Sequence, residues 1–246
     1  MPKPQRGRLV GVMGAIDDDD VEAVQRWIKH PNTHIEDTEL STNKTALIYA
    51  AAVGSSRCLQ LLLDAGANIR ATNSVGCSAT FAAAQENRLE CLRVLIDAGG
   101  DVHASTNTGS CPLHVCCKKG HVECVKLLLD AGDANVLQTD GASAVYIAAS
   151  EGQAGSLSLV LAAGADPNRP AGDRNCPPLW AATEMGSVPC VRALLATLSH
   201  THKHQQRHKH RSKRRGRRQQ QQQQQQYTPV DLNATCDAGS SALYIG

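Results

Sequence analysis

The chain has 246 residues and a formal net charge of +2, and it contains only one Phe, two Trp and four Tyr. So few aromatic side chains argue against an ordinary globular core, which would normally contain more of them. No run of eighteen apolar residues predicts a transmembrane helix, and the N-terminus lacks the apolar core of a secretory signal. The ten cysteines are therefore expected to stay reduced, in the cytoplasm or the nucleus.

The positive charge is concentrated in one tract. Residues 200–218 contain nine Lys and Arg and no acid, which leaves 16 of the 25 basic residues against 23 acidic ones elsewhere. The rest of the chain thus has a balance of −7.

The chain begins with an expected flexible N-terminus at residues 1–7. The string VEAVQRWIKH (21–30) has the spacing of a helix, and the four acids Asp17–Asp20 before it suit a helix N-terminus. The acids lack the alternating positions and the Gly of a calcium loop. We interpret 21–30 as the second helix of a degenerate first repeat, at about 8–40.

From residue 45 onward, two sequence blocks recur in register. The first block reads TALIYAA (45–51), SATFAAA (78–84), CPLHVCC (111–117), SAVYIAA (143–149) and PPLWAAT (177–183). The second begins thirteen residues later and reads CLQLLLDAG (58–66), CLRVLIDAG (91–99), CVKLLLDAG (124–132), SLSLVLAAG (156–164) and CVRALLATL (190–198). Successive first blocks start 33, 33, 32 and 34 residues apart, a period that predicts stacked repeats.

Each repeat predicts a short helix, a tight turn, a second helix and an extended finger. The turns are expected at residues that tolerate a positive φ: Gly54, Asn87, Gly120, Gly152 and Gly186. Four further glycines are expected to end the second helices: Gly66, Gly99, Gly132 and Gly164. Helices this short are stable only when neighbouring repeats cover their apolar faces.

The period, the tetrapeptide CPLH (111–114) and the string KKGHVECVKLLLDAG (118–132) resemble the ankyrin-repeat family. The resemblance covers about residues 8–198 and 231–246. It implies an all-α ankyrin-repeat solenoid with β-hairpin fingers, with about six repeats in 8–199 plus a half repeat. Other repeats place Ile48, Phe81, Tyr146 and Trp180 where the family favours His, which removes polar bracing between repeats.

The pattern stops after Ser199 and resumes at DLNATCDAGSSALYIG (231–246). Deleting residues 200–230 restores the 33-residue phase, so we interpret this basic, His- and Gln-rich tract as a disordered insert. Residues 231–246 are then the finger and first helix of an incomplete seventh repeat. Such a half repeat would leave an apolar face exposed, which indicates a fragment of a longer protein.

Three interpretations of the basic insert stay open. The string SKRRGRR (212–218) has the charge density of a nuclear-import signal. Residues 200–218 could instead contact nucleic acid nonspecifically through phosphates, although they have no aromatic residues for base stacking. The third interpretation is a low-complexity expansion with no selected role.

Six possible zinc ligands lie within fourteen residues: Cys111, His114, Cys116, Cys117, His121 and Cys124. The paired spacing of structural zinc sites is absent. Cys116 and Cys117 occupy positions that hold Ala in other repeats, and Cys124 aligns with cysteines of the other second helices, as expected for small buried residues. We predict core packing, with no metal and no cofactor. No acid is placed to orient a catalytic base, so no enzyme activity is expected.

The resemblance implies that a protein partner binds the fingers and the exposed faces of the first helices. By register the fingers are Arg70–Val75, His103–Thr108, Val136–Asp140 and Arg169–Arg174. The candidate partner-binding residues are Arg70, Asn73, His103, Ser105, Asn107, Lys118, Lys119, Gln138, Thr139, Arg169, Asp173 and Arg174. A surface of mixed polarity suits a protein or peptide better than a small molecule.

The strings VYIAASEG (145–152) and SLSLVLAAGADPN (156–168) are similar to ankyrin-repeat and SOCS-box proteins. That similarity implies the substrate-recognition array of a ubiquitin-ligase adaptor, which would join the cullin and elongin machinery if a SOCS box lies beyond Gly246. The alternatives are a plain signalling scaffold or inhibitor, and a nuclear ankyrin protein that contacts nucleic acid through its insert.

Overall fold

The computed structural model describes residues 9–171 and 175–197. Its helices in this part of the chain are α1 (Val10–Asp17), α2 (Val21–Ile28), α3 (Ala46–Val53), α4 (Ser56–Asp64), α5 (Ala79–Gln85), α6 (Leu89–Asp97), α7 (Pro112–Lys119), α8 (Val122–Ala131), α9 (Ala144–Ser150), α10 (Ala154–Ala162) and α11 (Pro178–Glu184). Residues 188–197 are also helical. The predicted order of short first and second helices is confirmed from the first repeat onward.

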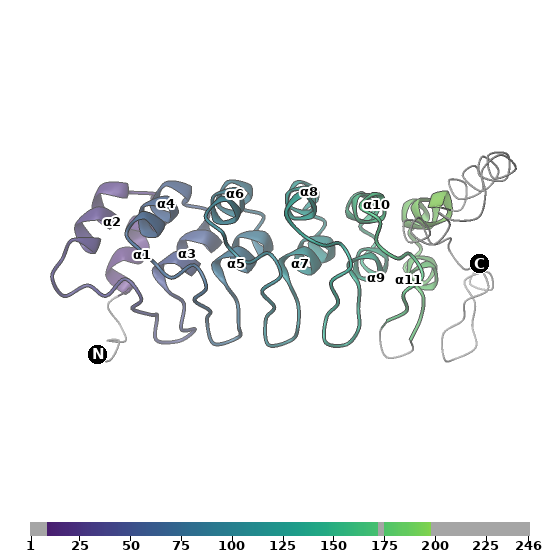
Figure 1. Ribbon diagram of the computed structural model, residues 1–246, viewed down its shortest axis with the longest axis horizontal. Coiled ribbons are helices and arrows are strands. Elements are labelled where there is room, and N and C mark those ends of the chain that lie inside the picture. Colours follow the sequence, from purple (N-terminus) through teal and green to yellow (C-terminus); the bar gives the residue numbers. More distant parts are fainter. Residues whose placement is uncertain (1–8, 172–174, 198–246) are drawn as a thin grey trace, which may run out of the picture. The chain divides into compact units, whose positions relative to one another are not determined.

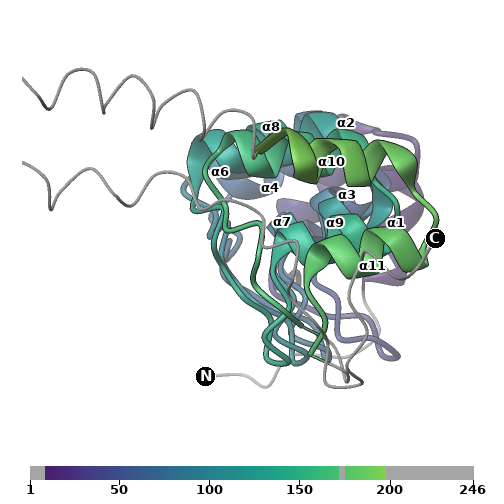
Figure 2. The ribbon, with the colours of Figure 1, turned by 90° about the vertical axis from the view of Figure 1, so that its right-hand side faces the viewer.

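The chain divides into two compact units. One comprises Met1–Cys116 with Lys126–Gly132, and the other comprises Cys117–Val125 with Asp133–Gly246. Within the first unit, α1, α3 and α5 form one layer, and α2, α4 and α6 form a second layer beside it (Figures 1 and 2). Within the second unit, α9 packs against α10 and α11. This is the two-layer arrangement of a helical repeat.

The first helices start where hydroxyl side chains cap them. The side chains of Thr45, Ser78 and Ser143 accept hydrogen bonds from backbone N–H groups three residues later, at 3.2–3.3 Å. Each hydroxyl satisfies one of the N–H groups that a helix start leaves without a partner. The first position of the repeated block therefore fixes the start of each of these helices.

The predicted turns between the two helices are confirmed. The backbone has a positive φ at each of the five positions: Gly54 (98°), Asn87 (56°), Gly120 (75°), Gly152 (69°) and Gly186 (70°). Side chains of the next repeat cover two of these glycines, Arg88 at Gly54 and Gln153 at Gly120. A side chain at either position would meet both backbone strain and a steric clash.

The predicted helix end at Gly132 is confirmed, because α8 ends at Ala131, directly before it. Gly66, Gly99 and Gly164 end their helices with a positive φ, but Gly132 does not, because α8 continues to Ala131. The 32-residue spacing removes one residue between α8 and its finger. A Cβ atom on Gly132 would lie 2.9 Å from Cε1 of His103, so this glycine provides room for a neighbouring side chain.

The fingers are extended, but they do not form the predicted β-hairpin strands in the described residues. Each of four fingers is closed by one isolated antiparallel bridge: Thr38 with Thr45, Thr72 with Ser78, Leu137 with Ser143, and Ala171 with Cys176. The two sides of each finger are short, so a single bridge forms before the chain enters the first helix of the repeat.

Hydrogen bonds join neighbouring repeats at the ends of the first helices. The Ser55 hydroxyl donates to the carbonyl of Ile16, and Nε of Arg88 donates to the carbonyl of Ala52 at 3.1 Å. These carbonyls belong to the last turn of a first helix, and that of Ile16 also accepts from the N–H of Asp19 at 3.1 Å. The residue before each of these second helices thus stabilises the repeat before it.

The predicted capping by the acids before α2 is confirmed for Asp20 only, whose carboxylate accepts from the N–H of Ala23 at 3.0 Å. Asp17 and Asp19 bind the second repeat instead. Asp17 accepts from the Tyr49 hydroxyl at 2.8 Å, and Asp19 accepts from the N–H of Cys58 at 3.1 Å. The first repeat, degenerate in sequence, is therefore tied to the second by several polar contacts.

Three segments assigned from the sequence lie outside the described residues: the N-terminal residues 1–7, the insert 200–230 and the half repeat 231–246. The total number of repeats in the chain therefore stays a prediction. Among the described helices, none is long and apolar enough to span a membrane.

Candidate protein-interaction surface

Hydrogen bonds between neighbouring finger tips build the surface of the first unit. Both the N–H and the hydroxyl of Ser74 donate to the carbonyl of Thr42, at 3.2 and 3.0 Å. One finger further, the N–H of Asn107 donates to the carbonyl of Val75 at 3.0 Å, and its side-chain amide donates to the carbonyl of Ser74 at 3.3 Å. Three successive tips are joined through their backbones, which limits the conformational entropy that a partner must remove on binding.

The structure divides the candidate residues of the first unit by role. Arg70, His103 and Ser105 are exposed on the fingers. Asn73 is half-buried, and its side-chain oxygen accepts from the N–H groups of Val75 and Cys77 at 3.0 and 2.9 Å. Asn73 therefore holds the shape of its own finger. Asn107 is exposed, although it also joins its finger to the preceding one.

In the second unit, Lys118 and Lys119 are exposed at the end of α7. Nζ of Lys118 lies 3.9 Å from a carboxylate oxygen of Glu151, an ion pair between exposed groups that contributes little to stability. Both lysines are thus accessible to a partner.

The remaining candidates of the second unit lie on its fingers. Thr139 and Arg169 are exposed, while Gln138 is half-buried and its N–H donates to the carbonyl of Ala142 at 3.0 Å. Asp173 and Arg174 lie outside the described residues.

Two exposed apolar side chains of the fingers are absent from the sequence-based set. Leu40 is 66% exposed and Val75 is 56% exposed. They lie on the first two fingers, which the Ser74–Thr42 hydrogen bonds hold together. Apolar groups in the centre of an interface contribute more to binding than polar groups at its rim. Leu40 was missed because its repeat departs from the period, whereas Val75 lies inside a predicted finger and was identifiable.

The cysteine and histidine group belongs to the core. His114 is fully buried, and its Nδ1 accepts a hydrogen bond from the N–H of Cys111 at 3.2 Å. The thiol of Cys116 contacts the carbonyl of Ala84 at 3.4 Å, and burial raises the pKa of the Cys111 thiol. In residues 9–171 and 175–197, no three His, Cys, Asp or Glu side chains are grouped as metal ligands. The predicted core packing is confirmed for the five buried members, Cys111, His114, Cys116, Cys117 and Cys124, whereas His121 is half-buried.

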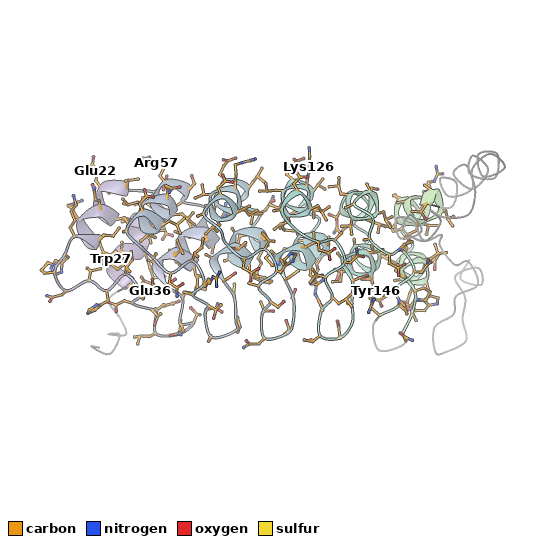
Figure 3. The ribbon with its side chains drawn as sticks, in the orientation of Figure 1. Glu22, Trp27, Glu36, Arg57, Lys126 and Tyr146 are labelled. Carbon is orange, nitrogen blue, oxygen red and sulfur yellow. The ribbon has the colours of Figure 1, made fainter. Side chains whose placement is uncertain are left out.

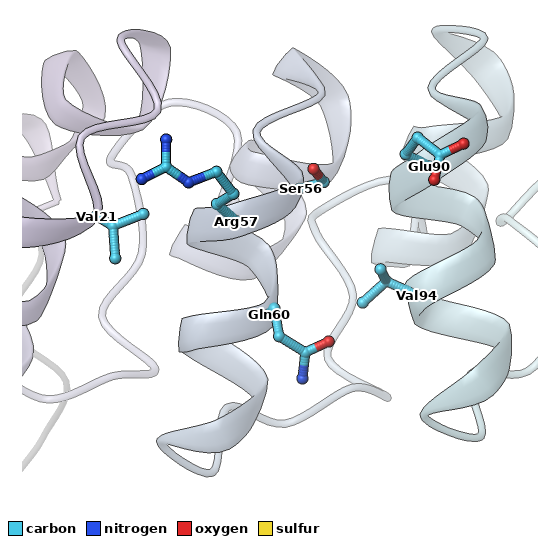
Figure 4. Close-up of a pocket in the computed structure, with 6 residues that line it drawn as sticks. All are labelled: Val21, Ser56, Arg57, Gln60, Glu90 and Val94. Carbon is cyan, nitrogen blue, oxygen red and sulfur yellow. The ribbon is translucent and has the colours of Figure 1, made fainter.

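The opposite face of the first unit, formed by the second helices, is polar. Glu22, Arg57 and Lys126 point outward from it (Figure 3). A shallow groove crosses α2, α4 and α6 there, lined by Val21, Ser56, Arg57, Gln60, Glu90 and Val94 (Figure 4). The groove is open to solvent, so it does not enclose a small substrate.

Comparison with known proteins agrees with this geometry. The family model described as ankyrin repeats (3 copies) matches residues 12–106 and 99–171, which together make up more than half of the chain. The chain belongs to the ankyrin-repeat family. The fold is accordingly the helical ankyrin-repeat solenoid.

A solved ankyrin repeat domain from Acinetobacter baumannii AYE is similar, with 27% identity and a TM-score of 0.67. The match covers 75% of this chain and 96% of that domain. No curated protein matches the chain. The comparisons therefore confirm the family and the fold, and ankyrin repeats indicate an interaction module that binds other proteins.

Proposed function

We propose that the protein is a non-catalytic scaffold that binds a partner protein through its fingers and the exposed faces of its first helices. The observation that carries this proposal is the set of hydrogen bonds between the tips of the first three fingers. They hold a surface of mixed character in place, with apolar Leu40 and Val75 beside basic Arg70. A preformed surface of this kind suits a folded or extended polypeptide.

An affinity capture with the full chain tests the proposal. The variant Leu40→Ser with Val75→Ser removes the apolar side chains of the tips, and the control Gln60→Ser with Lys126→Ser changes exposed residues of the second-helix face. Circular dichroism should show both variants folded. A specific partner should be retained by the wild-type chain and the control and lost by the tip variant. If all three chains retain the same proteins equally, the fingers do not carry the binding.

The sequence similarity of residues 145–168 favours a more specific role as a second candidate. The strings 145–152 and 156–168 resemble ankyrin-repeat and SOCS-box proteins, while the family model matches ankyrin repeats alone. The array would then capture a substrate for a cullin-based ubiquitin ligase. The complete native transcript tests this role: a SOCS box encoded after Gly246 supports it, and a transcript without one supports the plain scaffold or inhibitor.

A further inference from the structure

Three turns of the second unit share one backbone geometry. They lead into α8, into α10 and into the helical residues 188–197, and all three lie within that unit. In each turn, the first residue of the second helix donates its N–H to the carbonyl of the turn glycine: Val122 to Gly120 at 3.0 Å, Ala154 to Gly152 at 3.0 Å, and Val188 to Gly186 at 3.1 Å. Equivalent positions of the three turns therefore recur in register along the unit.

Neighbouring turns also contact each other. A Cβ atom on Gly152 would lie 3.6 Å from Cγ of Met185, which belongs to the following turn. Nζ of Lys118 lies 3.9 Å from a carboxylate oxygen of Glu151, which belongs to the next turn along the chain. The side chains of the three turns are thus ordered relative to one another before anything binds them.

The first and third turns expose large apolar side chains. Val122 is 38% exposed, Met185 is 57% exposed and Val188 is 59% exposed. In the described part of this unit, the exposed large apolar side chains are these three and Leu195, so none of them lies on a finger. Large apolar side chains that gather in contact with water mark interaction sites.

The charge at the ends of the first helices changes sign along the same turns. Lys118 is exposed in the first turn, and Glu184 is exposed at the equivalent position two repeats later. A rotation of 180° about the middle turn exchanges the first and third turns. It sets Lys118 of one copy opposite Glu184 of another, and Val122 opposite Val188. A surface with this order is complementary to itself.

We propose that these three turns form a homodimer interface, in which two copies of the chain meet antiparallel about Ala154. Each apolar contact and each ion pair then forms twice, because a two-fold interface repeats every contact. Three large apolar side chains per copy make a small interface, so the dimer is weak and reversible. The contact uses no finger residue and therefore goes beyond the proposed binding of a partner protein.

Sedimentation equilibrium of the full chain, freed of nucleic acid, tests the interface. The average mass of the wild type should rise toward twice that of one chain as the protein concentration increases. Met185→Ser with Val188→Ser should raise the dissociation constant about tenfold or more, because the dimer then buries less apolar surface. The control Gln60→Ser with Lys126→Ser, on the second-helix face of the first unit, should leave it unchanged. Circular dichroism should show that both variants are folded.

Charge reversal at low salt tests the antiparallel order, because screening is weak there. Lys118→Glu and Glu184→Lys should each raise the dissociation constant about tenfold, since like charges then face each other twice. The chain with both substitutions keeps its net charge and should return to within about threefold of the wild type. A wild type that stays monomeric would overturn the proposal. So would a double charge reversal that associates no more tightly than the single ones, or a Met185→Ser, Val188→Ser chain that associates like the wild type.

Discussion

The acids before α2 show how neighbouring residues of one type take different partners. Asp20 caps its own helix, whereas Asp19 caps α4, whose own N-cap residue, Ser55, makes no side-chain cap bond. A carboxylate oxygen of Asp19 also lies 4.0 Å from a guanidinium nitrogen of Arg57. The backbone of Asp19 has a positive φ of 50°.

Replacing Asp19 should therefore weaken the contact between the first two repeats. Asp19→Ala should destabilise the chain by about 1 kcal/mol, the usual effect of losing a helix cap. Asp18→Ala should cause no comparable loss, since Asp18 is exposed and follows the end of α1. Chemical unfolding followed by circular dichroism measures both variants. Equal unfolding midpoints for Asp19→Ala and the wild type would show that Asp19 does not stabilise the start of α4.

The buried thiols give a prediction that depends on pH. Burial raises the pKa of Cys58 to about 12, with a further contribution from its hydrogen bond with Asp19, and burial raises the pKa of Cys77 and Cys91 to about 11. The native thiols should thus be neutral and unreactive at pH 8. The stability that their burial contributes is fully present below the ordinary thiol pKa and is lost as the pH rises through about 11–12.

Ellman's reagent tests this in a Cys236→Ser chain, which leaves only the nine cysteines of the described part. All nine should react in denaturant, and almost none should react in the native protein at pH 8. Rapid labelling of several thiols in the native chain would show that the core opens readily.

At the scale of elements, the two helices of a repeat were predictable to different degrees. The first helices begin after Thr45, Ser78 and Ser143, which cap them locally. The second helices α4, α6 and α10 lack a side-chain bond from their own N-cap residue. The neighbouring repeat supplies the cap of α4, so the sequence of that helix alone does not contain the signal that stabilises its start.

Two glycine substitutions should have opposite effects. Gly120→Ala should destabilise the chain by about 1 kcal/mol or more, because φ is 75° there and the side-chain amide of Gln153 occupies the space of a Cβ atom. Gly14→Ala should stabilise it by about 0.5–1 kcal/mol, because Gly14 lies inside α1 with no atom within 4 Å of the new methyl group. Thermal unfolding measures both. A stabilised Gly120→Ala chain would contradict the described turn.

At the scale of the whole molecule, the two signs of charge are segregated along the sequence. The basic residues of 200–218 account for the positive net charge, and the rest of the chain has a balance of −7. A uniformly positive surface is therefore not expected, despite the net charge of +2.

Deleting residues 200–218 should change how the protein binds polyanions. The full chain should bind single-stranded DNA at low salt and dissociate as the salt concentration rises, because such binding depends on neutralising phosphates. The deleted chain, with a net charge of −7, should not bind at all. Fluorescence anisotropy across a salt series measures this. Unchanged binding after the deletion would place the nucleic-acid contact on the repeats.

The sequence by itself determined the repeat, its phase and its turns, because each depends on residues that act locally: a hydroxyl at a helix start, or a glycine or asparagine where φ is positive. It also indicated that the cysteines are buried, since they recur at core positions. Only the tertiary structure decided what joins one repeat to the next. Asp19, Glu36 and Ser55 bind partners 32–39 residues away, and no local pattern encodes such pairings.

The candidate interaction surface was likewise predictable in part from the sequence and in part only from the tertiary structure. Register predicted where the fingers lie, but exposure and hydrogen bonding separated the side chains that a partner can reach, such as Arg70, from those that shape a finger, such as Asn73.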